Sequence, residues 1–206
     1  MKIPSERKQI KDFKVALKDL EPVVKNPQYL WNGRDISNFS LRPREAWANW
    51  LLCVVFKKIH GDRITFAEDS EGDGIIVDKL SGLGIPTEHV SALEVPKRKK
   101  PLPQGEDRVI QAIKQKIGRG PEYAKGKYLV VFFDGAGLFY RNKIREAIFR
   151  RHNFVAVYCI GLLRTEGNCY IYSVTEFMDS HGDKSITFIV TVNMKEYIWE
   201  IKQQME

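Results

Sequence analysis

Apolar side chains recur along this chain with two distinct periods, one helical and one extended. Helical spacing is clearest over residues 43–58, where apolar positions lie three and four residues apart and predict a helix with one buried stripe. That stripe consists of Trp47, Trp50, Leu51, Val54 and Val55. Similar spacing predicts a short helix between residues 10 and 20, a second main helix over 107–117 and a third over 138–151.

Extended patterns predict five strands in the middle of the chain. Alternating and β-branched residues predict a three-strand meander over 63–67, 75–77 and 85–95. Unbroken apolar runs predict two strands buried on both faces, at 128–133 and 154–163. A meander followed by strand, helix and strand indicates an α/β fold with a mixed central sheet flanked by helices.

The 206 residues are enough for a single domain, and we expect one. Its core is predicted over 43–160. An N-terminal extension, residues 1–40, is expected to pack onto that core. A C-terminal β-hairpin extension is predicted within 165–206, from two alternating strands at about 168–177 and 185–193.

Charge is distributed unevenly, which says more than the formal net charge of +7. Residues 61–94 carry 2 basic and 8 acidic side chains. Residues 1–60 carry 12 basic and 6 acidic side chains, and residues 95–127 carry 10 and 3. An acidic island between basic flanks predicts a carboxylate site for a cation, set in a surface that attracts phosphate. Acidic turns that cluster without a function are the alternative.

Two acids of this island are predicted to face each other. If residues 73–78 pair antiparallel with 85–93, the turn around Leu80 and Ser81 places Asp73 directly opposite Glu88. Opposed side chains share a face at about 5 Å between their Cβ atoms. Two carboxylates at that distance repel each other unless a cation or a proton lies between them. A register slipped by one or two residues, with both acids in solvent, is the alternative.

These residues resemble the PD-(D/E)XK nuclease superfamily. The matching segments are Arg-Glu-Ala at 44–46, Gly-Asp-Gly-Ile-Ile at 72–76 and Pro-Thr-Glu-His-Val at 86–90. In order, they lie on a helix, on the second strand of the meander and on its third strand. The resemblance covers roughly residues 43–160 and implies a restriction-endonuclease-like core. It also implies an endonuclease, that is, a hydrolase of phosphodiester bonds in DNA or RNA that depends on Mg²⁺ or Mn²⁺.

The resemblance assigns roles to the three acids. Asp73 and Glu88 would be catalytic and would hold the metal, with Glu45 as an outer or third ligand. The metal would polarise the scissile phosphate and lower the pKa of the attacking water.

The chain departs from this family at the lysine that follows the third-strand acid by two positions, because Val90 stands there. The family sometimes supplies this lysine from a neighbouring element, and Lys114 on the second main helix, or Lys97 after the strand, is a candidate. Taking Glu94 as the acid would put Lys97 near the lysine position, but it spoils the hairpin pairing. His89 is expected on the strand face opposite Glu88. Two alternatives to the enzyme remain, a catalytically degenerate nuclease fold that binds nucleic acid or protein, and an unrelated α/β domain.

Basic side chains outside the acidic island are candidates for contacting nucleic acid, with DNA favoured. The predicted contact residues are Lys97, Arg98, Lys99, Lys100, Arg141 and Arg145. Phe139 and Tyr140 adjoin the two arginines and are weighed as base contacts. Many nucleases of this class dimerise, and the acidic C-terminal hairpin offers a surface for a homodimer.

The location of the protein is predicted to be cytoplasmic. No stretch approaches the roughly 18 apolar residues of a membrane span, so no membrane partner is expected. The charged N-terminus lacks the apolar region of a secretory signal. Cys53, Cys159 and Cys169 are far apart and are expected to be reduced thiols, the first two buried, because the paired spacing of a zinc site is absent.

Overall fold

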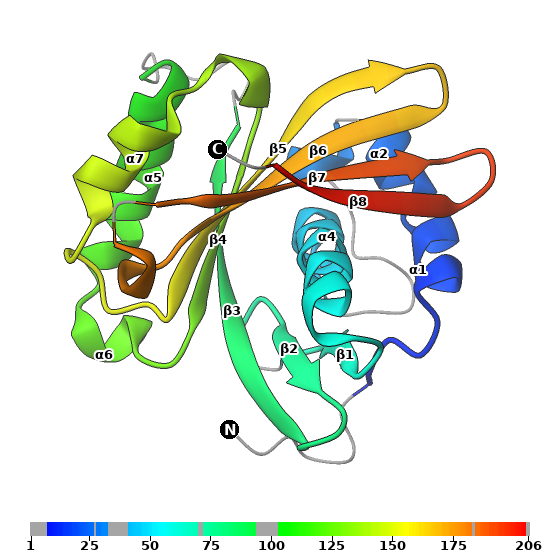
Figure 1. Cartoon of the computed structure of the whole chain (residues 1–206), viewed down its shortest axis with the longest axis horizontal. Helices are drawn as coiled ribbons and strands as arrows, with labels where there is room; N and C mark the ends of the chain where they lie inside the picture. The colour runs from blue at the N-terminus through cyan, green and yellow to red at the C-terminus, as the bar shows by residue number, and fades with distance from the viewer. Residues whose placement is uncertain are drawn as a thin grey trace.

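A single curled sheet of eight strands runs through the computed structural model (Figure 1). The structure describes residues 8–26, 28–32, 41–69, 72–93, 103–182 and 184–204. The strands lie side by side in chain order, as β1 (Ile64–Ala67), β2 (Ile75–Asp78), β3 (Leu83–Ala92), β4 (Tyr128–Phe133), β5 (Ala156–Glu166), β6 (Cys169–Phe177), β7 (Ile186–Asn193) and β8 (Ile198–Gln204). β4 is parallel to both β3 and β5, and the other neighbours are antiparallel.

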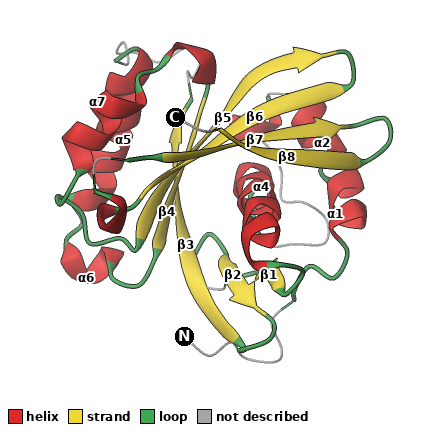
Figure 2. Ribbon diagram, in the orientation of Figure 1, coloured by secondary structure: helices red, strands yellow, loops and turns green. Residues whose placement is uncertain are grey.

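Helices flank both faces of this sheet, so the predicted mixed α/β architecture is confirmed (Figure 2). One side carries α1 (Phe13–Asp19), α2 (Glu21–Lys25), α3 (Tyr29–Asn32) and the long α4 (Pro43–His60). The other side carries α5 (Gly105–Ile117), α6 (Pro121–Ala124) and α7 (Arg141–Ile148). Short 3₁₀ turns lie at Ala136–Leu138 and Asp179–His181. Each helical layer covers its own apolar core.

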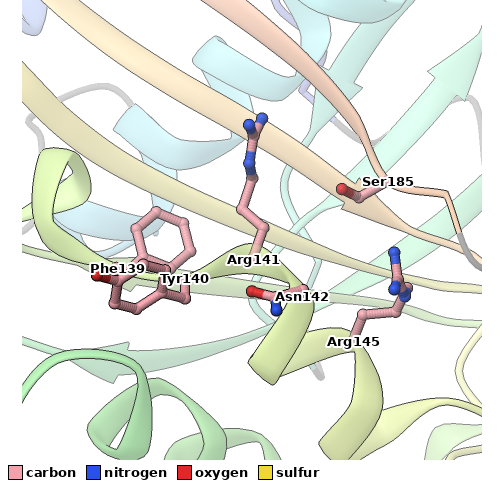
Figure 3. Close-up of a pocket in the computed structure, with 6 residues that line it drawn as sticks. All are labelled: Phe139, Tyr140, Arg141, Asn142, Arg145 and Ser185. Carbon is pink, nitrogen blue, oxygen red and sulfur yellow. The ribbon is translucent and has the colours of Figure 1, made fainter. Parts of the chain in front are cut away.

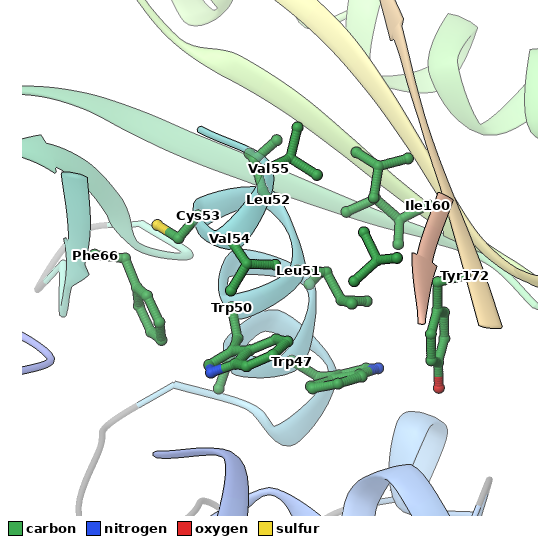
Figure 4. Packing of buried hydrophobic residues seen from close by; sticks show 14 of the residues in the cluster. Trp47, Trp50, Leu51, Leu52, Cys53, Val54, Val55, Phe66, Ile160 and Tyr172 are labelled. Carbon is green, nitrogen blue, oxygen red and sulfur yellow. The ribbon is translucent and has the colours of Figure 1, made fainter. Parts of the chain in front are cut away.

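Helix α4 differs from its prediction, because it is buried on all sides rather than along one stripe. Every residue from 45 to 56 is buried. The sheet curls around the helix, so that its aromatic side chains meet strands from the far end of the chain (Figure 4). The Trp47 ring lies 5.4 Å from that of Tyr172 on β6, and the Trp50 ring 5.1 Å from that of Trp199 on β8. The N-terminal extension closes the remaining side, with Phe13 and Leu17 in the same core.

The C-terminal segment contains the predicted hairpin, as the antiparallel pair β6 and β7, but a third strand, β8, extends it into a meander. β6 pairs with β5, so the segment continues the central sheet. The missed strand is β8, whose side chains are mostly exposed and polar, as expected of an edge strand. Near the N-terminus, Pro22 lies in the first turn of α2, which begins at Glu21.

The three cysteines are unpaired, and Cys53 and Cys159 are buried as predicted. The third predicted helix, 138–151, is shorter in the structure, because a 3₁₀ turn precedes α7 and the helix ends at Ile148.

Candidate active site

The β2–β3 hairpin has the predicted register. All four pairs of its ladder, beginning with Ile75 opposite Pro86, follow the pairing that sets Asp73 against Glu88. Beyond the ladder, the Thr87 N–H donates to the Gly74 carbonyl at 2.8 Å, which continues the same pairing toward the two acids.

The backbone that carries Asp73 is pressed against α4. Asn49 of α4 donates from Nδ2 to the Asp73 carbonyl at 2.9 Å. The next residue, Gly74, has φ of 129°, and a Cβ there would lie 2.4 Å from the same Nδ2 atom. Only glycine satisfies both the conformation and the space, so Gly74 fixes the approach of Asp73 to the helix.

The Asp73 carboxyl group is charged at an energetic cost. Burial raises its pKa, and the negative charge of Glu88 adds to this, while the His89 N–H, which donates to Oδ2 at 2.6 Å, acts in the opposite direction. Oδ1 accepts no hydrogen bond from any described residue. A cation placed between Asp73 and Glu88 would relieve their repulsion.

Glu88 faces α5, where it meets a lysine. Lys116 donates from Nζ to Glu88 Oε1, and both side chains are only 12% exposed. Burial raises the pKa of Glu88, but the hydrogen bonds from Lys116 and Tyr123 outweigh it, so the net shift is downward. The Tyr123 hydroxyl also accepts from Lys116 Nζ at 3.3 Å and so helps to fix the ammonium group.

The structure thus brings Lys116, and not the predicted Lys114, to Glu88. The two lysines are about 200° apart around the helix, and Lys114 is exposed. Val90 shares the face of Glu88 and packs against the apolar layer under α5. Lys116 therefore reaches, from the helix, the face from which a lysine at position 90 would project. Lys97 and Glu94, the other candidates for the lysine and the acid, lie outside the described residues, as does the basic run 97–100.

Glu45 lies at the start of α4, close enough to Asp73 to interact with it electrostatically. Its carboxyl group accepts from the Arg42 N–H at 3.3 Å and lies 3.6 Å from Arg44 Nη2. Burial raises the pKa of Glu45, and the charge of Asp73 adds to this. Within the described part of the chain, however, no three His, Cys, Asp or Glu side chains group as a metal site. The third ligand therefore stays a prediction, although Mg²⁺ commonly binds only one or two carboxylates, with waters and substrate phosphate.

His89 points to the face opposite Glu88, as expected, and its role there is to pack against α4. Its Nε2 atom lies 3.2 Å from Asn49 Oδ1, and its buried Nδ1 has no partner among the described residues. Burial, with smaller contributions from Arg44 and Lys116, holds the pKa of His89 well below its ordinary value.

This histidine predicts an acid-sensitive fold. In the unfolded chain this histidine is protonated below about pH 6.5, whereas in the folded protein it stays neutral. The free energy of unfolding should therefore fall as the pH drops below about 6.5, by up to about 1.4 kcal/mol per pH unit. Urea titrations at pH 7.5 and 5.5 measure the loss. His89→Gln should reduce the loss of stability between the two pH values. Burial also lowers the pKa of His152, so His152→Gln measures the part of the loss that comes from that histidine. An unchanged loss in His89→Gln would contradict the assignment.

Arg141 and Arg145, predicted to contact nucleic acid, lie together on α7, near the opposite end of α5 from Lys116. They line a pocket with Phe139 and Tyr140 (Figure 3). Sequence patterns missed Lys116, Tyr123 and Asn49. A signal existed for Lys116 alone, since it follows the buried Ile113 by three positions and so turns toward the sheet.

Comparison of the chain with protein-family models, curated proteins and solved structures gave no match. No helix in the described ranges is long and apolar enough to cross a membrane. A function therefore has to come from the chemistry of the site, and the homodimer and the cytoplasmic location stay predictions.

Proposed function

We propose that this protein is a nuclease that hydrolyses phosphodiester bonds in DNA or RNA with Mg²⁺ or Mn²⁺, on a restriction-endonuclease-like core. One observation carries the proposal: Asp73 and Glu88 interact across a hairpin whose register opposes them, with the Lys116 ammonium on Glu88. The order of α4, the β1–β3 meander, α5 and β4 supports it, since this is the order that the resemblance requires.

Each side chain has a role in this chemistry. Asp73 and Glu88 would hold the cation, and their mutual repulsion and the unbonded Oδ1 of Asp73 fit that use. A bound Mg²⁺ supplies a Lewis acid at the scissile phosphate and lowers the pKa of the attacking water. Lys116, steadied by the Tyr123 hydroxyl, would donate to a phosphate oxygen as negative charge builds up in the transition state. Glu45, whose pKa is raised by burial and by the charge of Asp73, would serve as an outer or third ligand.

A second function, binding without cleavage, is favoured by a different observation. Each acid already has a partner within the chain, namely Lys116 for Glu88, the His89 N–H for Asp73, and Arg44 for Glu45. A nuclease fold that has lost catalysis could be stabilised by these contacts alone and bind nucleic acid or a protein through its basic surfaces.

Metal dependence separates the two functions. Linear duplex DNA, single-stranded DNA and RNA are incubated with the protein in Mg²⁺, Mn²⁺, Ca²⁺ or EDTA, and products are resolved on denaturing gels. We expect cleavage of at least one substrate in Mg²⁺ or Mn²⁺, and none in EDTA. Salt-sensitive binding without cleavage in either metal would overturn the enzyme and favour the binding function.

Lys116 provides a sharper test, because its position can be exchanged. Lys116→Ala is expected to slow cleavage about 10²-fold by removing a donor to the developing charge. The Val90→Lys/Lys116→Ala double variant should regain part of the rate, since both positions face the same layer. Lys114→Ala removes the same charge from the exposed side of α5 and should leave the rate unchanged. Equal rates for Lys116→Ala and Lys114→Ala would contradict the role.

A further inference from the structure

A second site lies on α7 and is distinct from the acidic pair. It is a pocket of about 270 Å³, lined by Phe139, Tyr140, Arg141, Asn142, Arg145 and Ser185. Figure 3 shows the two aromatic rings on one side of the pocket, with Arg145 and Ser185 on the other. The pocket is therefore lined by an aromatic surface, an amide, a hydroxyl and two guanidinium groups.

This combination matches a nucleotide. Arginine forks bind phosphate oxygens through paired, charge-assisted hydrogen bonds. Base stacking on an aromatic ring needs an accessible face, and Tyr140 is 63% exposed, with the Lys143 ammonium 4.8 Å from its ring centroid. Asn142 and Ser185 add neutral donors and acceptors beside both groups.

Contacts within the protein hold Phe139 and Arg141 in place. Phe139 packs edge-on against Phe133 of β4, with 4.5 Å between the ring centroids. Arg141 donates from Nη1 to Thr187 Oγ1 at 2.6 Å and to Gln204 Oε1 at 3.4 Å. A site fixed in this way loses little side-chain entropy when a ligand binds.

Helix α5 links this pocket to the acidic pair. Near its C-terminal end, Lys116 contacts Glu88, and near its N-terminal end, Glu106 contacts Lys143 of α7. Lys116 follows Glu106 by ten positions, which corresponds to about 15 Å along the helix axis. A nucleic-acid strand advances about 3.4 Å per nucleotide in a duplex, so about four or five nucleotides would cover this distance.

We propose that the α7 pocket binds one nucleotide of the substrate strand, about four or five nucleotides from the scissile phosphate. Arg141 and Arg145 hold its phosphate, and its base stacks on Tyr140. The inference rests on the proposed function only for the identity of the scissile site; the pocket binds nucleic acid whether or not the acidic pair is catalytic.

Binding without metal tests the pocket directly. Fluorescein-labelled oligothymidylates of 3, 8 and 12 nucleotides are titrated in EDTA, with fluorescence anisotropy as the readout. Tyr140→Ala and Arg145→Ala are expected to bind the 8- and 12-mers about 10-fold more weakly than wild type. Arg164→Ala, which removes an arginine 63% exposed on β5, should bind like wild type. Thermal unfolding monitors folding of each variant, and Tyr140 is exposed enough for its truncation to be tolerated.

Competition and a small substrate separate the possible failures. The labelled 12-mer is challenged with an excess of thymidine monophosphate or of unlabelled 12-mer. If the monophosphate displaces it as effectively as the unlabelled 12-mer, the pocket is a site for free nucleotides, and the strand assignment is overturned. Hydrolysis of bis(p-nitrophenyl) phosphate in Mg²⁺ needs only the acidic pair and should be the same in Arg164→Ala as in wild type. If the wild-type protein does not hydrolyse this substrate but its binding still depends on the pocket residues, only the proposed nuclease function is refuted. Wild-type affinity in both pocket variants refutes the pocket.

Discussion

Asp73→Asn is expected to slow cleavage at least about 10³-fold and, at the same time, to make the metal-free protein more stable. The carboxylate is half-buried beside Glu88 and Glu45, so its charge costs folding free energy, as its raised pKa shows. An asparagine oxygen can still accept from the His89 N–H, which preserves the loop. Loss of a metal ligand removes several kcal/mol of transition-state stabilisation, and each 1.36 kcal/mol is about tenfold in rate.

The two effects of this substitution have opposite signs, and this identifies a functional carboxylate. A residue with a purely structural role would lose stability when its charge is removed. Folded Asp73 binds its proton more readily than the unfolded chain does, so it contributes stability as the pH falls through its folded pKa. The Asn variant should lack that acid-side gain. Urea titrations at several pH values, with EDTA present, measure this effect.

Asp78→Asn is the matched control, because it makes the same change in the same hairpin. Asp78 accepts from the Leu80 N–H at 2.9 Å in the turn, and hydrogen bonds from Leu80 and Ser81 help to lower its pKa against the effect of burial. Its replacement should leave cleavage unchanged and reduce stability slightly. The proposal fails if Asp73→Asn cleaves at the wild-type rate, or if both variants lose stability alike.

The hairpin was predictable because its geometry is local. A short turn fixes the register, and a period of two sends Glu88 and His89 to opposite faces, where α5 and α4 receive them. The register that directs Asp73 toward Glu88 follows from counting residues. The fold class was predictable for the same reason, since unbroken apolar runs separated by helical spacing indicate buried strands with crossover helices.

Other features depend on tertiary packing that local patterns do not encode. Whether Lys114 or Lys116 faces the sheet depends on the rotation of α5, which Ile113 and its apolar neighbours set by packing. The burial of α4 on all sides over residues 45–56 depends on β6–β8, which come more than a hundred residues later and curl over it. Contact with the β1–β3 side alone would require only a single apolar stripe on α4. A second apolar face is needed because β6–β8 curl over the helix.

Trp50→Ala is expected to lower the free energy of unfolding by about 3–5 kcal/mol, because it leaves a cavity at the centre of the contact between α4 and strands β6–β8. Trp50 is fully buried, stacks on Trp47 with 5.1 Å between the ring centroids and meets Trp199 edge-on. Its Nε1 also donates to the Phe13 carbonyl at 3.0 Å, which ties the N-terminal extension to α4. One side chain therefore joins three segments that are far apart in the sequence.

Trp50→Phe separates the two contributions. It keeps a ring in the core but removes the indole donor to the Phe13 carbonyl, and the loss of one such hydrogen bond costs about 0.5–1.5 kcal/mol. Urea unfolding followed by far-UV circular dichroism measures both variants, and similar losses below about 1.5 kcal/mol would contradict the central role of the ring. Because Asn49, the neighbour of Trp50 on α4, holds the backbone of Asp73, a loosened helix would also release the acidic pair. Trp50→Ala should therefore lose cleavage activity at urea concentrations well below its own unfolding midpoint. Asp73→Asn, in contrast, should lose cleavage activity while its free energy of unfolding rises.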